Sequence, residues 1–293
     1  REPIELPAPN EEWEMDFGEI KIDNETKLEF FLVIDRGTSR VVYLEGCMGY
    51  TAETALEAVA RLLITCGRPP RLRFDRDPRF MGSWTMDSYP SSLVRFLRVL
   101  GIEPIVCPPR RPDLKPFVER TIGTLKAEWL ARFSLNDYAK AIDVLPNFVF
   151  YHNAERVHFG RACNGKTPDN AFPELPALPQ IPEQVDPDSW LWTGDQRVFR
   201  RRITSNGTIQ IDKYTYTVDH TRAKTNVLVY LDAPNRQFHV LQDGVLLRSL
   251  DIKGLHGPEP MTFQDYITQM KQEARSIAIH RWAMWFNPGD VPF

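Results

Sequence analysis

Residues 12–35 have the sequence EWEMDFGEIKIDNETKLEFFLVID. Polar and apolar residues alternate through the first half of this stretch, which is typical of a half-buried strand. The apolar run of residues 27–35 predicts a second strand, and a short polar turn fits between the two. Alternation places Asp16 on the face opposite Trp13 and Met15. Asp16 therefore stands on the polar face of a central strand, a position that suits function more than solubility.

Beyond this pair of strands, strands and helices alternate. Residues 51–66 follow a helical period and are followed by Gly67 and Pro69, which terminate helices. Alternation of strands and helices after an antiparallel meander predicts an α/β domain with a mixed sheet. We expect strands at 12–22, 27–35, 40–46, 71–74 and 103–107, and helices at 51–66, 91–100, 117–132 and 136–152.

A proline-rich stretch separates this domain from a second one. Its proline density indicates an extended linker at 173–189. Short strands with the hairpin signals Asn206-Gly207 and Asp243-Gly244 predict a small all-β barrel at 190–257. A helical tail follows at 258–293, and we assign residues 1–172 to the α/β domain. The expected strands are 196–202, 208–211, 214–218, 226–231, 237–242 and 245–250, and the expected tail helix is 263–280.

Length, charge and cysteine spacing limit the kinds of protein this chain can be. A chain of 293 residues with 42% hydrophobic content can form one large domain or two ordinary ones. The net charge of -3 gives no overall sign of a nucleic-acid partner. Acidic residues dominate 1–60, however, and basic residues outnumber acidic ones in 190–260, so local basic surfaces can form. The four cysteines lie far apart and outside zinc-binding spacings, which predicts reduced, mostly buried thiols in a cytosolic protein.

The apolar runs and the first residues of the chain show whether a membrane span or a signal peptide is to be expected. No apolar run approaches the 18 residues or more that a transmembrane helix requires, so we expect no membrane partner. The opening residues 1–5 do not resemble a signal peptide. A first residue other than Met predicts a fragment whose upstream part is missing.

Three acidic residues stand where phosphodiester chemistry needs them. Asp16 lies within the first strand, Asp75 follows the short strand 71–74, and Glu119 opens the helix at 117–132. Two carboxylates at strand ends and one on a helix can hold a pair of divalent cations, which promote in-line displacement at phosphodiesters. Any one of the 39 acidic residues alone would be read as a solvated charge. Three in this order, one of them on a buried strand, favour a site.

The order of these motifs resembles the catalytic core of DDE-type integrases and transposases. The resemblance covers about residues 10–172, and its most specific part runs from Pro108-Pro109 to Val118-Glu119-Arg120. It implies an RNase H-like fold, in which helices flank a mixed five-stranded sheet. Residues 207–214 and 227–230 look like the C-terminal β-barrel of Mu-type bacterial transposases. The matching stretches are Trp13-x-Met15-Asp16, 33–40, 74–80, 108–121, 151–158 and Thr167-Pro168.

This resemblance implies a DNA transposase or integrase that cleaves and transfers DNA strands at transposon ends. Asp16 would bridge two Mg²⁺ ions, while Asp75 and Glu119 would each complete one of them, and Mn²⁺ would substitute. The implied partners are transposon-end DNA, target DNA, further copies of the chain in a multimer on DNA, and an ATPase that selects the target. The implied location is the bacterial cytoplasm, in association with the nucleoid.

Two departures from the family pattern stand out. Gly is usual at the position of Asp77, so Asp77 competes with Asp75 for the second acidic role. We favour Asp75, because it directly follows the strand and keeps the register of the residues after it. The gap between Asp75 and Glu119 is also longer than in retroviral integrases, which predicts an inserted loop at 81–92 that could line the DNA path.

Basic residues near Glu119 are candidates for phosphate contacts. Lys126 shares a helix face with Glu119 and points along the proposed catalytic face, although a solvated lysine explains it equally well. The basic loop 110–115 adjoins the proposed site, which favours phosphate contact over mere solubility. The predicted DNA-binding residues are Arg110, Arg111, Lys115, Arg120 and Lys126.

Other polar and aromatic residues are interpreted structurally. Asp35 precedes a turn, where aspartate commonly accepts hydrogen bonds from the turn backbone. His152 and His158 have no Cys or His partner at zinc spacing, so we expect packing or hydrogen-bonding roles. Trp190 and Trp192 are expected to pack inside the barrel.

Two rival functions stay open. An RNase H-like nuclease would hydrolyse DNA without joining strands. A domesticated DNA-binding or assembly protein would keep the fold without catalysis, and its signature would be a lost acidic residue. All three acidic residues are present in this chain.

Overall fold

The computed structural model describes residues 5–22, 26–81, 89–108, 114–133, 135 and 137–286. The chain divides into two compact units. The first unit comprises Arg1–Arg79 and Gly101–Ile181, and the second comprises Phe80–Leu100 and Pro182–Phe293. Each unit is therefore built from two separate stretches of sequence.

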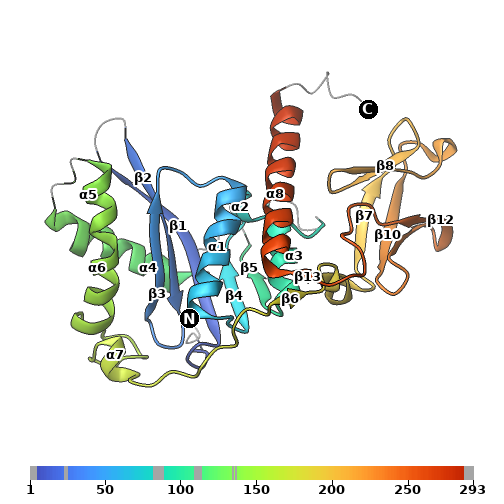
Figure 1. Ribbon diagram of the computed structural model, residues 1–293. Coiled ribbons are helices and arrows are strands. Elements are labelled where there is room, and N and C mark those ends of the chain that lie inside the picture. The colour runs from blue at the N-terminus through green and yellow to red at the C-terminus, as the bar shows by residue number, and fades with distance from the viewer. Residues whose placement is uncertain are drawn as a thin grey trace. The chain divides into compact units, whose positions relative to one another are not determined.

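A mixed five-stranded sheet forms the centre of the first unit (Figure 1). Its strand order is β3-β2-β1-β4-β5. The strands β1, β2 and β3 form an antiparallel meander, whereas β4 runs parallel to both β1 and β5. The predicted mixed sheet is confirmed. Its strands are β1 (Glu12–Lys21), β2 (Lys27–Asp35), β3 (Val41–Cys47), β4 (Arg71–Phe74) and β5 (Glu103–Val106).

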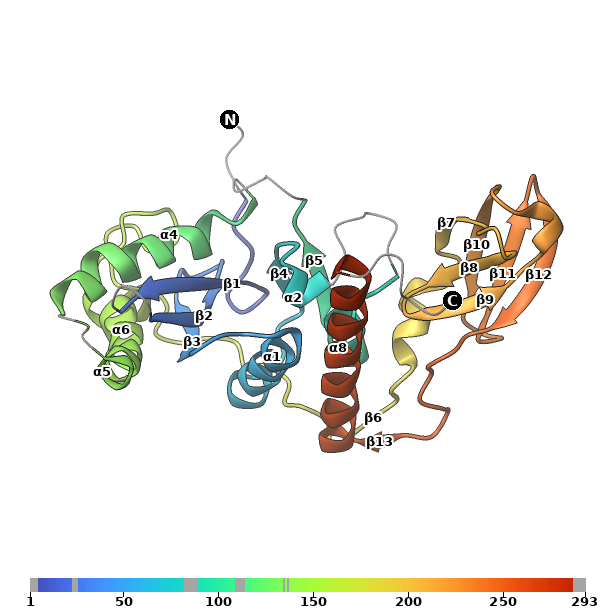
Figure 2. The ribbon, with the colours of Figure 1, turned by 90° about the horizontal axis from the view of Figure 1, so that it is seen from above.

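The two faces of the sheet are covered by different helices. Figure 2 shows α4 (Pro116–Thr124) on one side of the meander and α1 (Ala52–Cys66) on the other. Asp16 pairs with Leu32 of β2, and Leu32 belongs to the apolar core that also contains Val118 of α4. Residues directly opposite each other in an antiparallel pair point to the same face. Asp16 therefore belongs to the face covered by α4.

The helices that follow β5 differ from the expected pair of long helices. The first is α-helical only over α4 and continues as a π-helical turn, Leu125–Trp129, and a 3-10 turn, Leu130–Arg132. The second is divided before Pro146. Proline has no N–H and breaks a helix interior, but it is tolerated in the first turn of a new helix, which is where α6 places it. Its parts are α5 (Tyr138–Asp143), α6 (Leu145–Phe150) and the π-helical turn Tyr151–Glu155, and the short α7 (Pro168–Ala171) follows.

The all-β part of the second unit has one apolar core that includes Trp190, Phe199 and Phe238. A four-stranded antiparallel sheet with order β12-β11-β10-β7 and the hairpin β8-β9 surround this core. At the predicted hairpin turn Asp243-Gly244, both residues have positive φ, 50° and 80°, as a type I′ turn requires. The strands are β7 (Val198–Arg202), β8 (Thr208–Ile211), β9 (Tyr214–Thr217), β10 (Asn226–Asp232), β11 (Gln237–Gln242) and β12 (Val245–Asp251).

Two helices pack against each other in the second unit, α3 (Ser92–Val99) and the C-terminal α8 (Phe263–Phe286). The Phe96 ring stacks on Tyr266 with centroids 5.9 Å apart. The sequence interpretation assigned α3 to the N-terminal domain, but α3 belongs with the C-terminal unit because α8 covers it. No helix in the described ranges is long and apolar enough to cross a membrane.

The structure also bears on the predictions for the cysteines, the two tryptophans and the linker. All four cysteines are free thiols, and Cys107 and Cys163 are buried. Trp190 is buried as expected, but Trp192 is 62% exposed. The expectation for Trp192 was wrong because the two residues lie on a 3-10 turn, Ser189–Gly194, in which side chains two positions apart point in different directions. The predicted linker contains a short strand, β6 (Gln184–Val185), which pairs with β13 (Met261–Thr262).

Candidate active site

The three predicted acidic residues occupy three elements of the first unit. Asp16 lies on β1, Asp75 directly follows β4, and Glu119 lies in the first turn of α4. Trp13 and Leu72 pair where β1 and β4 run side by side in parallel. Asp16 and Asp75 each stand three residues beyond that pair, so they lie at the same level of two neighbouring strands.

A single ammonium group joins the carboxylates of the two strands. The Nζ of Lys115 lies 2.9 Å from Oδ2 of Asp16 and 3.3 Å from Oδ2 of Asp75. Lys115 is only 4% exposed. Burial by itself would lower the pKa of Lys115, but the two carboxylates outweigh burial and raise that pKa. Lys115 is therefore a buried cation that draws Asp16 and Asp75 together.

Glu119 stands one helical turn after Lys115, on the same side of α4. Burial raises the pKa of Glu119, and the negative charges of Asp16 and Asp75 raise it further, while Lys115 opposes them. Burial also raises the pKa of Asp16, again against the influence of Lys115. The structure therefore brings Asp16 and Asp75 together on the Lys115 ammonium, whereas Glu119 is exposed on α4, one helical turn after Lys115.

Glu14, two residues before Asp16, anchors the helix that carries Glu119. Its carboxylate accepts hydrogen bonds from the backbone N–H groups of Phe117 and Val118, at 3.1 and 3.0 Å. Its other oxygen lies 2.8 Å from Nε of Arg36. Glu14 is fully buried, and burial raises its pKa to about 7. The carboxylate caps the start of α4 from the neighbouring strand and fixes α4 to β1.

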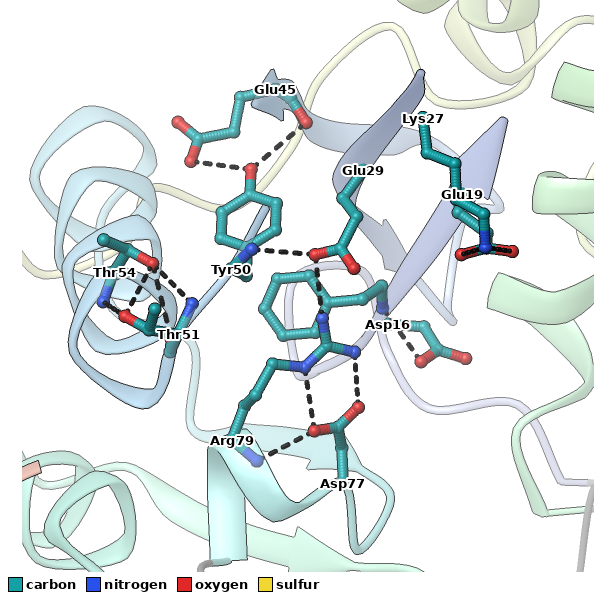
Figure 3. A network of polar contacts seen from close by, with 11 residues as sticks. Asp16, Glu19, Lys27, Glu29, Glu45, Tyr50, Thr51, Thr54, Asp77 and Arg79 are labelled. Carbon is teal, nitrogen blue, oxygen red and sulfur yellow. Dashed lines mark hydrogen bonds and ion pairs between the residues drawn. The ribbon is translucent and has the colours of Figure 1, made fainter. Parts of the chain in front are cut away.

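Asp75 and Asp77, the two candidates for the second acidic role, have different partners. Asp77 accepts hydrogen bonds from Nε and the backbone N–H of Arg79, at 2.9 and 2.8 Å. Figure 3 shows Arg79 between Asp77 and Glu29, and Nη1 of Arg79 lies 3.0 Å from Glu29. The guanidinium also lies over the ring of Phe17, 4.2 Å from its centroid. Asp77 is thus engaged by Arg79, whereas Asp75 shares Lys115 with Asp16.

The donor chemistry of Asp16, Asp75 and Glu119 suits Mg²⁺, which prefers carboxylate oxygens. In the structure, Asp16 and Asp75 instead close around the ammonium of Lys115. Among the described residues, no group of three His, Cys, Asp or Glu side chains is arranged to hold one metal ion. The residues therefore fit a divalent cation by type and by charge, provided that the cation takes the position of the Lys115 ammonium.

The predicted DNA-binding residues fall into three groups. Arg120 and Lys126 are exposed on α4 and on the turn after it, where a phosphate can reach them. Arg110 and Arg111 lie outside the described residues, as does most of the predicted loop at 81–92. The side chain of Lys115 does not lie where a phosphate-binding loop residue was expected to place it. Its ammonium points inward because two carboxylates offer it ion pairs there.

The polar residues that were interpreted structurally, Asp35, His152 and His158, behave as expected. Asp35 accepts hydrogen bonds from the backbone N–H of Gly37 and the hydroxyl of Thr38, at 3.2 and 2.6 Å, and so stabilises the turn after β2. Nε2 of His152 lies 3.1 Å from the carbonyl oxygen of Ser39, and Nε2 of His158 lies 3.0 Å from the carbonyl oxygen of His152. Burial lowers the pKa of His152 to about 3.

Sequence reasoning missed Glu14. The available signal was its period-two phase with Asp16, which places both carboxylates on one face of β1. The alternation indicates that the side chains of Glu14 and Asp16 point to the same face of the sheet. It does not reveal that the N–H groups of α4 bind Glu14, because α4 lies about a hundred positions away in the sequence.

Comparison with solved structures finds retroviral integrases. The chain is 16% identical to a chain of the simian T-cell lymphotropic virus intasome in complex with PP2A regulatory subunit B56 gamma, covering 86% of this chain and 80% of that one, with a TM-score of 0.47. The HTLV-2 integrase catalytic core domain in complex with magnesium is 19% identical over 56% of this chain and 96% of that one, with a TM-score of 0.41. The BIV integrase catalytic core is also 19% identical, over 56% of this chain and 93% of that one, with a TM-score of 0.40.

Sequence comparison finds an insertion element. The insertion element IS476 uncharacterized 39.2 kDa protein of Xanthomonas euvesicatoria is 25% identical over 182 aligned residues, and the match covers 59% of this chain. This chain spans 50% of that relative's length. The family described as "Integrase core domain" matches residues 100–168. The stretch that contains β5, Lys115, Glu119 and the helices after them is therefore similar to an integrase core domain.

Proposed function

We propose that this chain is the catalytic part of a DNA transposase or integrase that cleaves and transfers DNA strands at the ends of a mobile element. The observation that carries the proposal is the convergence of Asp16 and Asp75 on Lys115, with Glu119 one helical turn away. The integrase core domain match over residues 100–168 and the insertion-element relative support the same class of activity.

The proposed chemistry is phosphoryl transfer by in-line displacement. Asp16, Asp75 and Glu119 would hold two Mg²⁺ ions, which supply Lewis acidity to the attacking and leaving oxygens, and Mn²⁺ would substitute. Glu14 keeps α4 against β1, so that Glu119 stays near Asp16. The exposed Arg120 and Lys126 would orient the phosphate backbone, as charged side chains do in protein–DNA complexes. Phosphoryl transfer depends mainly on such positioning and on charge neutralisation.

The proposed partners follow from this reaction. They are the DNA ends of the element, a target DNA, and further copies of the chain that assemble on DNA. An ATPase that selects the target, and association with a bacterial nucleoid, belong to the same proposal.

The test is a strand-transfer assay. The full-length protein is incubated with Mg²⁺, a labelled duplex taken from the ends of the element that encodes it, and a supercoiled plasmid. The proposal predicts covalent joining of the labelled 3′ end to the plasmid and none in EDTA. Cleavage without joining would instead identify a nuclease, and DNA binding without turnover would identify a non-catalytic assembly protein.

Matched substitutions tie the activity to the site. Asp16→Asn, Asp75→Asn and Glu119→Gln are each expected to reduce strand transfer by about a hundredfold or more, the scale for losing one electrostatic stabiliser. DNA binding in a gel-shift assay should persist. Asp77→Asn is the control, because the same chemical change falls on a carboxylate already engaged by Arg79. Full activity in Asp75→Asn together with its loss in Asp77→Asn would reverse the assignment.

A further inference from the structure

Lys115 has an unusual position for a lysine at the start of a helix. It is the N-cap residue of α4, but its side chain makes no capping hydrogen bond. Its backbone carbonyl accepts the N–H of Glu119 at 3.4 Å, while its ammonium reaches Asp16 and Asp75. A basic side chain at this end of a helix opposes the helix dipole. The two carboxylates must therefore provide the attraction that keeps the ammonium buried.

Charge balance explains why a cation is needed at this point. Asp16 and Asp75 meet at the Lys115 ammonium, and Glu119 stands in the first turn of α4, four residues after Lys115. Two carboxylates held this close repel each other unless a cation lies between them. Lys115 supplies one positive charge to this group. Two divalent ions would supply four, and they would repel an ammonium that stayed between the same oxygens.

We propose that Lys115 is a built-in counter-ion that holds Asp16 and Asp75 together in the metal-free protein and leaves this position when divalent metal binds. The inference rests on the proposed function, because it concerns the same carboxylates. Two cations that compete for the same oxygens weaken each other's binding reciprocally. Lys115 therefore stabilises the metal-free protein and lowers its affinity for metal.

The released ammonium has a second role in this arrangement. After leaving Asp16 and Asp75, it stays tethered beside the carboxylates by its four-carbon stem. A phosphate that enters the site offers it a new partner, since lysine binds phosphates as a point charge. Lys115 thus links metal loading to capture of the DNA backbone, and the phosphate contact predicted from the sequence belongs to the metal-bound state.

The test is calorimetric titration of the purified full chain with MnCl₂, without DNA. Lys115→Met is expected to lower the Kd for Mn²⁺ by about tenfold, within the usual range for coupling between two ligands. Lys140→Met removes the same charge from an exposed position on α5 and should leave the Kd unchanged. Equal affinities for wild type, Lys115→Met and Lys140→Met would overturn the inference.

Thermal unfolding gives a second readout. In EDTA, Lys115→Met should melt below wild type, because it leaves the part-buried Asp16 and its neighbour Asp75 repelling each other without their cation. In saturating MnCl₂ its melting temperature should rise by more than that of wild type. A rise equal to that of wild type would contradict the inference. Lys115→Gln keeps hydrogen-bond donors for both carboxylates and is measured in parallel in case the Met variant does not fold in EDTA.

Two further variants distinguish a failure of the counter-ion inference from a failure of the proposed metal-dependent function. Lys115→Arg keeps the positive charge, so its Kd should stay near wild type, and an Arg variant that binds as tightly as Lys115→Met would refute competition by charge. Asp16→Asn should abolish the Mn²⁺ signal. Loss of that signal in Asp16→Asn, with wild-type affinity in Lys115→Met, would overturn the counter-ion inference alone. Absence of Mn²⁺ binding to wild type and Lys115→Met alike would remove both the inference and the metal-dependent function.

Discussion

Asp75 and Asp77 are close in sequence but pair with different cations. Asp75 and Asp77 lie two residues apart, and the sequence leaves them competing for one role. The structure gives Asp77 a guanidinium partner in Arg79 and gives Asp75 an ammonium shared with Asp16. An arginine fork satisfies both oxygens of a carboxylate at once. Asp75 instead shares the single ammonium of Lys115 with Asp16, and under the proposed function a divalent ion replaces that ammonium.

Glu14 carries the first stability prediction. Glu14→Ala leaves two buried backbone N–H groups of α4 unpaired and leaves Arg36 with Glu12 as its one remaining carboxylate among the described residues, so the free energy of unfolding should fall by about 3 kcal/mol. Glu19→Ala is the matched control on the same strand, because Glu19 forms only an exposed pair with Lys27 at 3.1 Å. Its effect should stay within about 0.5 kcal/mol. Urea denaturation measures both changes, and similar losses in the two variants would contradict the anchoring role of Glu14.

At the scale of elements, the site is an assembly of β1, β4 and α4. The parallel pairing of β4 with β1 sets the level of Asp75 beside Asp16. The capping bonds from Glu14 set the position of α4. The close approach of β1 and β2 depends on Gly18, where a Cβ atom would lie 2.2 Å from the Phe30 ring.

Gly18→Ala tests that approach. The added methyl group must displace Phe30 from a fully buried position, so the variant should lose about 1–3 kcal/mol of stability, as overpacked cores do. Gly123→Ala is the control, because no atom lies within 4 Å of a Cβ at that exposed helical position. Alanine is also the better helix former, so Gly123→Ala should be neutral or slightly stabilising. Thermal unfolding compares the two, and a Gly18→Ala variant as stable as wild type would show that the packing is not tight.

The π-helical turn Tyr151–Glu155 carries a pH prediction. Burial lowers the pKa of His152 to about 3, from 6.5 for an ordinary histidine. The folded state therefore resists protonation, so this contribution to stability is complete above pH 6.5 and is lost as the pH falls towards 3. Between these values, wild type should lose about 1.4 kcal/mol per pH unit more than His152→Gln. Urea titrations at several pH values measure the slopes, with the exposed His220→Gln as control. Equal slopes for wild type and His152→Gln would contradict the prediction.

Local pattern predicted the elements well, and partners distant in sequence account for what it missed. The bounds of β2 and β4 match the expected strands, because hydrophobic alternation is a property of adjacent residues. The order of Asp16, Asp75 and Glu119 was also readable. The inward turn of Lys115 was not, because its partner Asp16 lies 99 positions away. The break after α5 is different, because it has a local cause in Pro146, which helical periodicity alone does not take into account.

At the scale of the whole molecule, the boundary between the two units does not follow the order of the chain. The segment Phe80–Leu100 lies between β4 and β5 in sequence but belongs to the second unit. Within that unit, Phe96 stacks on Tyr266, and Arg95 lies 2.7 Å from Glu273 of α8. The proline-rich stretch predicted a simple linker between consecutive domains. That pattern could not reveal an excursion from within the first domain.

A truncated chain tests this organisation. A chain that ends at Ile181 retains α3 but loses α8, so Phe96 loses the ring of Tyr266 and Arg95 loses the carboxylate of Glu273. It should bind a hydrophobic dye more strongly than the full chain and should unfold at lower urea concentration. Phe96→Ser in the truncated chain should reduce the dye binding, because it removes the largest uncovered ring of α3. A truncated chain with low dye binding and full stability would argue for an independent N-terminal domain.

The most direct test of the central claim is a crystal structure of the chain soaked in MnCl₂, with anomalous diffraction to locate manganese. We expect anomalous peaks bound by carboxylate oxygens of Asp16, Asp75 and Glu119, with the Lys115 ammonium displaced from between the two aspartates. Peaks elsewhere, or Lys115 still bridging Asp16 and Asp75 at saturating manganese, would contradict the account.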